Sequence, residues 1–351
     1  MDKKVSIKDI ARHVGVSTAL ISYVLNNKDE RVSPEMAAKI RKAAAELNYQ
    51  PNLIAKSLKS GKTNTLGLIV ADISNPFFST IARIIEDEAK KYGYTVIFGS
   101  SDESVEKSQG LIEALLNRQV DAMIIAPAEF TESQISYLQQ KDVPYVLIDR
   151  YFPDIDSNCV RINNYQAAYN AVEHLIKMGN RRIMMMAYNT GMQHISERKR
   201  GYLEALKDNQ IPFGEDWLAL ASYHHLEEDV ERIMNQLLLP EPRVDAIFFA
   251  TNSLAVQGLK QVVRLGISVP EDLAIISFDE SDAFDFFHSP ITYVRQSLTD
   301  IGREAVRLLM DNINQKMMKH VQVVVNASLI IRESCGGRER SSLRVVLEGG
   351  G

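Results

Sequence analysis

The chain has 351 residues, of which 45% are hydrophobic and 24% are charged. These proportions are typical of a folded globular protein and exclude a fibrous or intrinsically disordered chain. Cys159 and Cys335, the two cysteines, lie far apart in the sequence and cannot form a disulfide framework or a zinc site. We therefore expect a reduced, cytoplasmic protein. We expect no membrane association, because no signal-peptide pattern or apolar run of about 20 residues is present.

The formal net charge of −5 conceals an uneven distribution along the chain. Residues 1–62 carry 12 Lys and Arg against 6 Asp and Glu, a net charge of +6. The remaining residues carry 28 basic and 39 acidic side chains, a net charge of −11. A small basic segment joined to an acidic one indicates that the basic segment alone meets a polyanion.

The basic segment predicts three short helices. Ser6 and Asp9 form a capping box at the start of the first helix, and Gly15 breaks the helical pattern after it. Ser17 is a good N-cap for a second helix that ends near residue 26. Ser33 is followed by proline, which is typical of the first position of a helix.

The spacing of Ala11, Gly15, Ile21 and Val24 fits two helices that cross at a sharp turn. The open face of the second helix then presents small or hydrogen-bonding side chains, which suit insertion into the major groove of DNA. A plain packing module is the alternative, but the local positive charge favours DNA binding. The side chains on this face are Ser17, Thr18, Ala19, Ser22, Tyr23 and Asn26.

Beyond a polar linker at residues 59–64, apolar segments of strand length alternate with amphipathic helical segments. This pattern indicates parallel sheets that helices cover on both faces. There are too many units for one compact sheet, so we predict two Rossmann-like lobes with a ligand cleft at the strand ends between them. The expected strands are 66–71, 95–98, 122–126, 145–148, 183–187, 246–250 and 273–278, and expected helices include 77–92, 105–117, 166–178 and 253–265.

Several motifs of the basic segment closely resemble the lactose/galactose repressor family of bacterial transcription regulators. They are VSIKDIA (5–11), GVS (15–17), ISYVLN (21–26), VSPE (32–35), AELNYQPN (45–52) and AKSL (55–58). The likeness extends to about residue 334. It implies an α/β protein with an N-terminal helix-turn-helix head and a two-lobe body of the periplasmic-binding-protein type, which acts as a DNA-binding transcriptional regulator, here a repressor.

The expected domains follow from the linker and this resemblance. The DNA-binding head covers residues 1–62, with a hinge helix at about 52–59, and the ligand-binding and dimerisation body covers 63–340. One lobe is expected at 63–161 and 293–322, the other at 162–292 and 323–340. Residues 341–351 are polar and glycine-rich, which predicts a disordered tail.

The resemblance also implies roles for residues of the head. Thr18, Ala19 and Tyr23 match base-reading positions, and Leu58 matches a hinge leucine that wedges into the minor groove. Helix packing is the alternative role for Leu58. Two heads would read a pseudo-palindromic double-stranded operator as a homodimer. The positions that match phosphate-contacting or positioning residues are Ser6, Ser17, Ser22, Asn26, Arg31, Ser33, Tyr49, Asn52 and Ala55.

Candidate effector residues lie at strand ends of the body. Phe77 and Phe78 follow the first strand, where one ring could stack on a sugar and the other could pack in the core. Asp149 and Arg150 end the fourth strand. The family resemblance adds Arg198, Asn252 and Asp279, and Tyr223 is a weaker aromatic candidate. Trp217 is expected to be a packing residue, and a surface salt bridge is the alternative role for Arg198.

These residue types suit a neutral or acidic polyhydroxylated effector, and we favour a sugar or a sugar derivative. A protein corepressor or a non-sugar metabolite, such as a purine, is the alternative. A sugar receptor without DNA binding is disfavoured by the basic head. We predict no enzyme, cofactor or metal site, because no catalytic constellation is evident. His224 and His225 are expected in a solvated loop, and Met184–Met186 in a buried strand.

Overall fold

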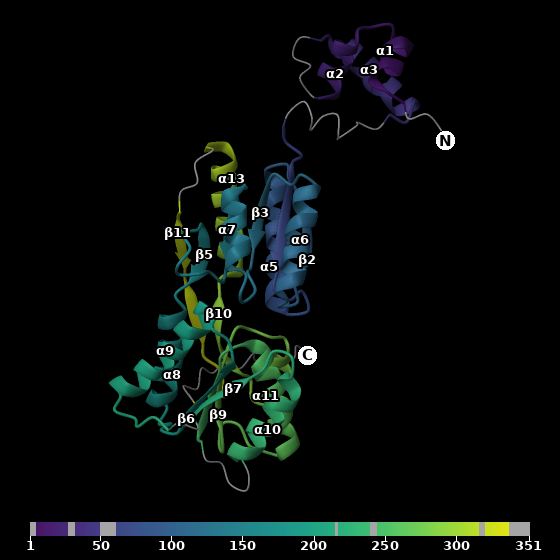
Figure 1. The fold of residues 1–351 in the computed structure, drawn as a ribbon. Helices are drawn as coiled ribbons and strands as arrows, with labels where there is room; N and C mark the ends of the chain where they lie inside the picture. Colours follow the sequence, from purple (N-terminus) through teal and green to yellow (C-terminus); the bar gives the residue numbers. More distant parts are fainter. Residues whose placement is uncertain are drawn as a thin grey trace, which may run out of the picture. The chain divides into compact units, whose positions relative to one another are not determined.

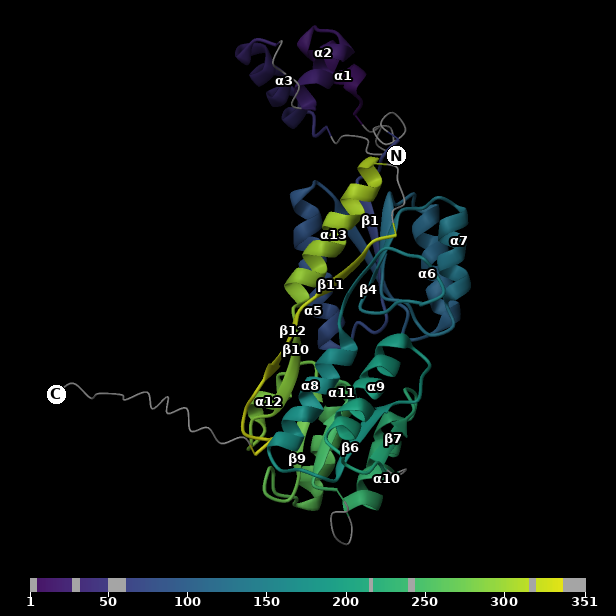
Figure 2. The same ribbon diagram turned by 90° about the vertical axis from the view of Figure 1, so that its left-hand side faces the viewer.

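The computed structural model describes residues 5–26, 32–49, 61–214, 217–238, 244–315 and 320–336. They form two units, Met1–Thr63 and Asn64–Gly351, and each is considered by itself (Figures 1 and 2). Within the described ranges, no helix has the length and apolar character that a membrane crossing requires. The predicted hinge helix with Asn52, Ala55 and Leu58, together with Arg31 and the tail at 341–351, lies outside the described residues.

The first unit contains the three helices predicted for the head, α1 (Ile7–Val14), α2 (Thr18–Leu25) and α3 (Pro34–Glu46). The Ser6 backbone N–H donates to the Asp9 carboxylate at 2.9 Å, and Gly15 takes the left-handed conformation at φ 81° that ends α1. The hydroxyls of Ser17 and Ser33 each accept a backbone N–H at 3.3 Å at the starts of α2 and α3. The predicted helix starts are therefore confirmed.

A miniature core holds these three helices together. Ile10, Ile21, Val24 and Ile40 have no exposed surface, and Val14 is buried beside them. Their burial fixes which side of α2 faces inward. The opposite side of α2 is left exposed for the candidate DNA-contacting residues.

The first sheet of the body is entirely parallel, with strand order β11-β5-β4-β3-β1-β2. Helices α5 (Pro76–Lys91) and α13 (Leu298–Gln315) cover one face, and α6 (Val105–Asn117) and α7 (Glu132–Gln140) cover the other (Figure 2). The strands are β1 (Thr65–Val70), β2 (Thr95–Ser100), β3 (Ala122–Ile125), β4 (Tyr145–Ile148), β5 (Cys159–Ile162) and β11 (Gln322–Val325).

The second sheet has strand order β12-β10-β9-β8-β6-β7, with only β12 antiparallel. Helices α8 (Asn164–Lys177) and α9 (Gln193–Asp208) lie on one side and α10 (Leu226–Leu238) and α11 (Asn252–Leu265) on the other (Figure 1). A short helix α12 (Ala283–Phe286) follows β9. The strands are β6 (Ile183–Tyr188), β7 (Leu218–Ala221), β8 (Ala246–Phe249), β9 (Ala274–Phe278), β10 (Thr292–Gln296) and β12 (Ala327–Ile330).

The fold class predicted from the sequence is confirmed, but two lobe crossings differ from the expected ones. Strand β10 pairs with β9 and β12 in the second sheet, so the crossing follows Gln296 rather than residue 292. Strand β11 pairs with β5 in the first sheet, so the next crossing follows Val325 rather than residue 322. Both differences arise because sheet pairing, which the sequence does not display, sets the boundary. Met184–Met186 lie fully buried in β6, as predicted.

Candidate functional site

A cavity of about 320 Å³ opens between the two lobes of the body. It lies at the carboxyl ends of the parallel strands, where ligands of open α/β sheets bind. The cavity walls come from the segments that follow β1, β2, β3 and β4 in one lobe and β6, β7, β8 and β9 in the other. Seven of the eight predicted effector residues line it: Phe77, Phe78, Asp149, Arg150, Arg198, Tyr223 and Asp279.

Two aspartates owe their positions to the backbone at the strand ends. Asp149 follows β4 with φ 64°, and Asp279 follows β9 with φ 66°. This left-handed conformation is uncommon for residues other than glycine, although Asp tolerates it better than most. The turn directs each chain out of its strand at the cleft. The two carboxylates consequently stand at the same cavity although 130 residues separate them in the sequence.

Burial weakens the ionised form of both carboxylates. It raises the pKa of Asp149, and the positive charges of Arg198 and Arg150 only partly oppose this shift. Burial also raises the pKa of Asp279 to about 6, against the lowering effect of Arg198 and of a hydrogen bond from Gln296. The Gln296 amide donates to Asp279 Oδ1 at 2.7 Å. A ligand that donates hydrogen bonds to these carboxylates would restore the solvation that burial removes.

Arg198 is the most deeply buried charge of the site, with 2% of its surface exposed. Its Nε donates to Asn164 at 2.8 Å, and its Nη1 donates to the Ala250 carbonyl at 2.7 Å. The guanidinium lies 3.5 Å from the centre of the Phe278 ring and 3.9 Å from the Asp279 carboxylate. Burial lowers the pKa of Arg198, and Asp279 opposes this shift. The surface salt bridge that was the alternative for this residue is therefore ruled out.

Arg150 is held by a carboxylate that the sequence analysis did not identify. Two of its nitrogens donate to the two Glu103 carboxylate oxygens at 2.8 and 2.7 Å. A third contact joins Nη1 to the Pro127 carbonyl at 3.3 Å. The Arg150 Nε lies 3.7 Å from Asp149. Burial lowers the pKa of Arg150, but Glu103, together with Tyr223 and Asp149, outweighs this effect, so the pKa is raised.

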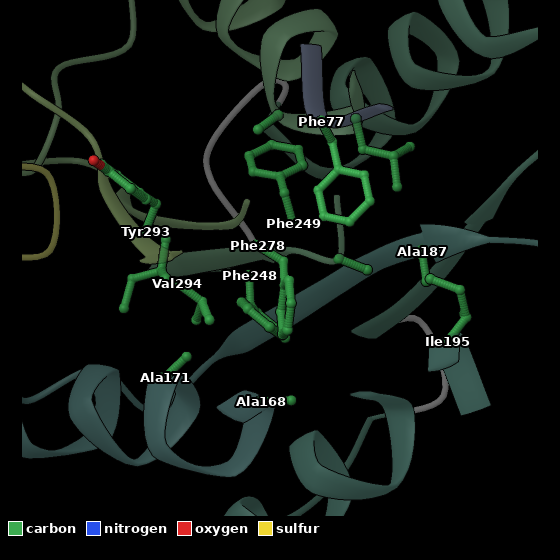
Figure 3. Close-up of a cluster of buried hydrophobic side chains, with 14 of the residues drawn as sticks. Phe77, Ala168, Ala171, Ala187, Ile195, Phe248, Phe249, Phe278, Tyr293 and Val294 are labelled. Atoms are coloured by element: carbon green, nitrogen blue, oxygen red, sulfur yellow. The ribbon is translucent and has the colours of Figure 1, made fainter. Parts of the chain in front are cut away.

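Aromatic side chains form walls of the cavity in both lobes. Phe77 and Phe78 meet edge to face with ring centres 5.0 Å apart, and both are buried. In the other lobe, Tyr188 and Tyr223 stack with centres 4.3 Å apart. In Figure 3, Phe77 belongs to the same cluster of buried side chains as core residues of the second lobe. Phe77 therefore both lines the cavity and packs in the core.

Asn252 is the one predicted effector residue that does not line the cavity. It lies at the start of α11, where its amide nitrogen donates to Asn75 at 3.1 Å and to the Glu280 carbonyl at 3.2 Å. The Asn75 amide donates back at 3.3 Å. In this structure the Asn252 side chain is therefore bound by Asn75 of the other lobe and by Glu280 of its own lobe, and direct effector contact by Asn252 stays a prediction.

Several cavity residues were missed by sequence reasoning. Glu103, Glu129 and Tyr188 each lie at or just beyond the end of a strand, and this position was a usable signal. His194 gives no such signal, since it lies at the start of α9, and its burial lowers its pKa well below the usual value. His224 is exposed, yet it lines the cavity mouth. In the described ranges, no group of His, Cys, Asp and Glu side chains is arranged to hold a metal ion.

Trp217 packs as expected. It is partly buried against the hydrophobic core, and its carbonyl accepts the Tyr202 hydroxyl at 3.2 Å. It does not line the cavity.

The candidate DNA-contacting residues of the head fall into two groups: exposed side chains, and side chains that bond to other groups of the head or are partly buried. Thr18, Ala19 and Tyr23 are exposed on α2, and the Tyr23 side chain has 54% of its surface accessible. Ser22 and Asn26 are joined, since the Asn26 amide donates to the Ser22 carbonyl at 2.7 Å. The remaining described candidates have structural partners or partial burial: Ser6 at Asp9, Ser17 and Ser33 as helix caps, and the half-buried Tyr49.

Comparisons with known proteins match both units. Residues 6–52 match the model for bacterial regulatory proteins of the lacI family, and residues 172–335 match the periplasmic binding protein-like domain. The ribose operon repressor of Halalkalibacterium halodurans is 32% identical over 338 residues, which cover 96% of this chain and 98% of that protein.

Two solved structures are also similar. A LacI family regulator of Enterococcus faecium with bound ribose is 26% identical, with a TM-score of 0.68 over 77% of this chain and 98% of its own. The lac repressor dimer bound to operator has a TM-score of 0.82 over 95% of this chain and 99% of its own. At 22% identity, this second likeness shows the fold alone.

Proposed function

Since the chain belongs to the lacI family of bacterial regulatory proteins and is a DNA-binding transcriptional regulator, we propose that it is a repressor controlled by a small polyhydroxylated effector. The effector is a sugar or a sugar derivative that binds in the cleft between the lobes. The observation that carries this proposal is the cavity itself, where buried charged groups and aromatic rings from both lobes converge. Ribose in a similar regulator supports the same ligand class.

The chemistry of the cavity suits hydroxyl groups. The carboxylates of Asp149 and Asp279 are acceptors, and Arg198 retains donors at Nη2 beyond those that bind Asn164 and the Ala250 carbonyl. Ionised partners make hydrogen bonds about twice as strong as neutral ones. Phe78 and Tyr223 supply apolar faces against which the C–H side of a sugar ring packs. We assign the cleft a binding role and no catalytic role.

The exposed face of α2 supplies the DNA contacts in this proposal. Thr18, Ala19 and Tyr23 read base edges in the major groove, and the surrounding polar side chains and helix starts position the phosphates. Two heads of a homodimer read a pseudo-palindromic operator. Leu58 is proposed as the minor-groove wedge, with Asn52, Ala55 and Arg31 among the phosphate-contacting or positioning residues.

Contacts between the lobes offer a route from effector to operator. The pair Asn75 and Asn252 joins the two lobes. A second contact between the lobes is the hydrogen bond from the Gly191 backbone N–H to Glu129 at 2.6 Å. An effector that binds both lobes stabilises the closed arrangement. Operator affinity then changes by the difference in effector affinity between the open and closed states.

A thermal-shift screen of the full chain tests the effector class. Neutral sugars, uronic acids, phosphosugars, purines and nucleosides are compared at equal concentration, and a ligand specific for the folded state raises the Tm. We expect a neutral sugar to give the largest shift. A rise in Tm only with purines or nucleosides would show that the effector is not a sugar. No change in Tm with any of these ligands would favour a protein corepressor.

A further inference from the structure

The loop that follows β2 directs a carboxylate into the cleft by an unusual backbone path. Asp102 and Glu103 are consecutive residues in the left-handed conformation, with φ of 50° and 56°. Non-glycine residues rarely adopt this conformation, and it persists where surrounding contacts enforce it. The contacts here are a hydrogen bond from the Glu103 N–H to the Ala71 carbonyl at 3.1 Å and the binding of the Asp102 carboxylate by Ser100 and Lys107.

The carboxylate that this loop presents neutralises Arg150. The two side chains form a two-pronged ion pair at 2.7 and 2.8 Å, with only 11% of Glu103 and 7% of Arg150 exposed. Arg150 also donates to the Pro127 carbonyl. The Tyr223 hydroxyl of the opposite lobe interacts with the same Glu103 carboxylate. Glu103 therefore occupies one N–H group on each terminal nitrogen of Arg150, the two nitrogens through which Arg150 could otherwise hold an anion end-on.

The charge balance of the cavity also disfavours the binding of an anionic ligand. Its lining includes four carboxylates, those of Glu103, Glu129, Asp149 and Asp279, but only two guanidinium groups, those of Arg150 and Arg198. Arg198 is already bound to protein acceptors through two of its nitrogens. A phosphate or carboxylate on a ligand would thus enter a site with surplus negative charge, in which Glu103 already holds both terminal nitrogens of Arg150, and this is costly in a buried site.

We propose that Glu103 is a specificity-determining residue of the effector site, a built-in counter-ion of Arg150 that excludes phosphorylated and carboxylated ligands. This inference rests on the proposed function. It narrows the expected effector from a neutral or acidic polyhydroxylated ligand to a neutral one. The Glu103 carboxylate takes the place at Arg150 that the anionic group of a phosphosugar or a uronic acid would take.

Isothermal titration calorimetry on the full chain tests this role with matched ligands. The probes are D-ribose with D-ribose 5-phosphate, D-glucose with D-glucose 6-phosphate and D-glucuronate, and inorganic phosphate alone. In the unsubstituted protein, we expect no binding of phosphate or of any anionic sugar. In Glu103→Gln, Arg150 loses its counter-ion, so at least one anionic probe should bind at least tenfold more tightly than in the unsubstituted protein.

Two further variants separate the release of Arg150 from a general change of charge. Glu103→Asp keeps the carboxylate and should keep the exclusion, which also guards against a misfolded Glu103→Gln. Glu129→Gln removes one negative charge from the same cavity, but Glu129 makes no bond to Arg150. We expect Glu129→Gln to gain less than threefold in anion affinity.

The outcomes distinguish this inference from the proposed function. Binding of an anionic sugar to the unsubstituted protein as tightly as its neutral partner would overturn the role of Glu103, as would an unchanged exclusion in a folded Glu103→Gln variant. If no neutral sugar binds to any form of the protein, but phosphate binds to Glu103→Gln and not to the unsubstituted protein, the proposal of a sugar effector is wrong and the role of Glu103 in excluding anions is supported. If Glu103→Gln and Glu129→Gln gain equally in affinity for anionic probes, the effect is explained by the net charge of the cavity, and a specific role of Glu103 is rejected.

Discussion

In the head, the candidate recognition residues Thr18, Ala19 and Tyr23 are exposed and come from one helix. In the cleft, Asp149, Arg198 and Asp279 are almost inaccessible and come from three distant segments. An exposed side chain on a helix held by its opposite face can change without loss of the fold. A buried charge whose partners are also buried cannot. Substitutions on the exposed face of α2 should therefore alter binding alone, whereas substitutions of the buried cleft residues should alter binding and stability together.

The largest difference is expected when the buried guanidinium of Arg198 is removed. Arg198→Ala leaves Asp279 and the Ala250 carbonyl without their buried partner, so we expect a loss of about 3–5 kcal/mol in the stability of the body. Urea unfolding, followed by the fluorescence of Trp217, measures it.

Arg200→Ala is the matched control. Arg200 lies two residues further along α9 and is exposed, and its guanidinium lies 4.6 Å from the centre of the Tyr165 ring. Its loss should cost no more than about 1 kcal/mol. Equal unfolding midpoints for the two variants would show that the buried network around Arg198 does not hold the body together.

Tyr23 provides the opposite case. Tyr23→Ala removes an exposed base-reading candidate, so operator affinity should fall by about 10- to 100-fold, as expected for loss of one specific base contact. The head should unfold at an unchanged temperature, because Tyr23 contributes nothing to the buried core.

The measurement is fluorescence anisotropy on an operator obtained by selection from random DNA, with Tyr23→Phe as the control that removes only the hydroxyl. A lowered Tm with unchanged operator affinity would assign Tyr23 to packing and would remove the contrast with the cleft.

The buried carboxylate Asp279 should make effector binding depend on pH. Its folded pKa of about 6 lies above the usual carboxyl value, so the folded protein holds a proton that the unfolded chain releases. Its contribution to stability therefore falls as pH rises from about 4 to 6. Effector hydroxyls that donate to the ionised carboxylate favour the deprotonated form, so effector affinity should rise about tenfold from pH 5 to pH 7.

Calorimetry of the effector hit across this range measures the rise, and Asp279→Asn should abolish the component centred near pH 6. An identical pH profile in Asp279→Asn would assign the titration to another group. Operator binding through α2 should show no pH dependence centred near pH 6 that arises from a carboxylate of this helix, since α2 contains no Asp or Glu.

A smaller effect is expected for the contact between the lobes. Asn75 and Asn252 exchange hydrogen bonds at 3.1 and 3.3 Å, so removal of both should cost less than the sum of the two single changes to Ala. We expect a coupling of about 0.5–1.5 kcal/mol in effector affinity. Calorimetry on the four members of the cycle measures it, and strict additivity would mean that the pair does not act in cleft closure.

The head was predictable almost to the residue because its information is local. Caps at Ser6, Ser17 and Ser33 and the break at Gly15 set each helix end within a few positions. In the body, β4 and α6 have the predicted bounds, since both are continuous and bordered by polar residues. Strands β5, β7, β10, β11 and β12 were not predicted. They have four or five residues, and β11 and β12 lack a fully buried run.

The cleft was predictable only in part. Strand ends and the family resemblance pointed to Asp149, Arg198 and Asp279, which the structure brings to one cavity. They did not reveal that Asn252 pairs with Asn75 of the other lobe, because that hydrogen bond joins segments 177 residues apart. The position of Glu103 just beyond a strand was a usable signal, but its pairing with Arg150 was not predictable, because it depends on a left-handed turn and on a residue 47 positions away.

The most direct test of the account is the affinity of the full-length protein for its selected operator, measured with and without a saturating concentration of the effector found by the thermal-shift screen. We predict a change of at least tenfold in Kd with a neutral sugar, and little change when the same sugar is added to Arg198→Ala. An operator Kd that is identical at every effector concentration in the unsubstituted protein, despite proven binding in the cleft, would contradict the coupling between cleft and head.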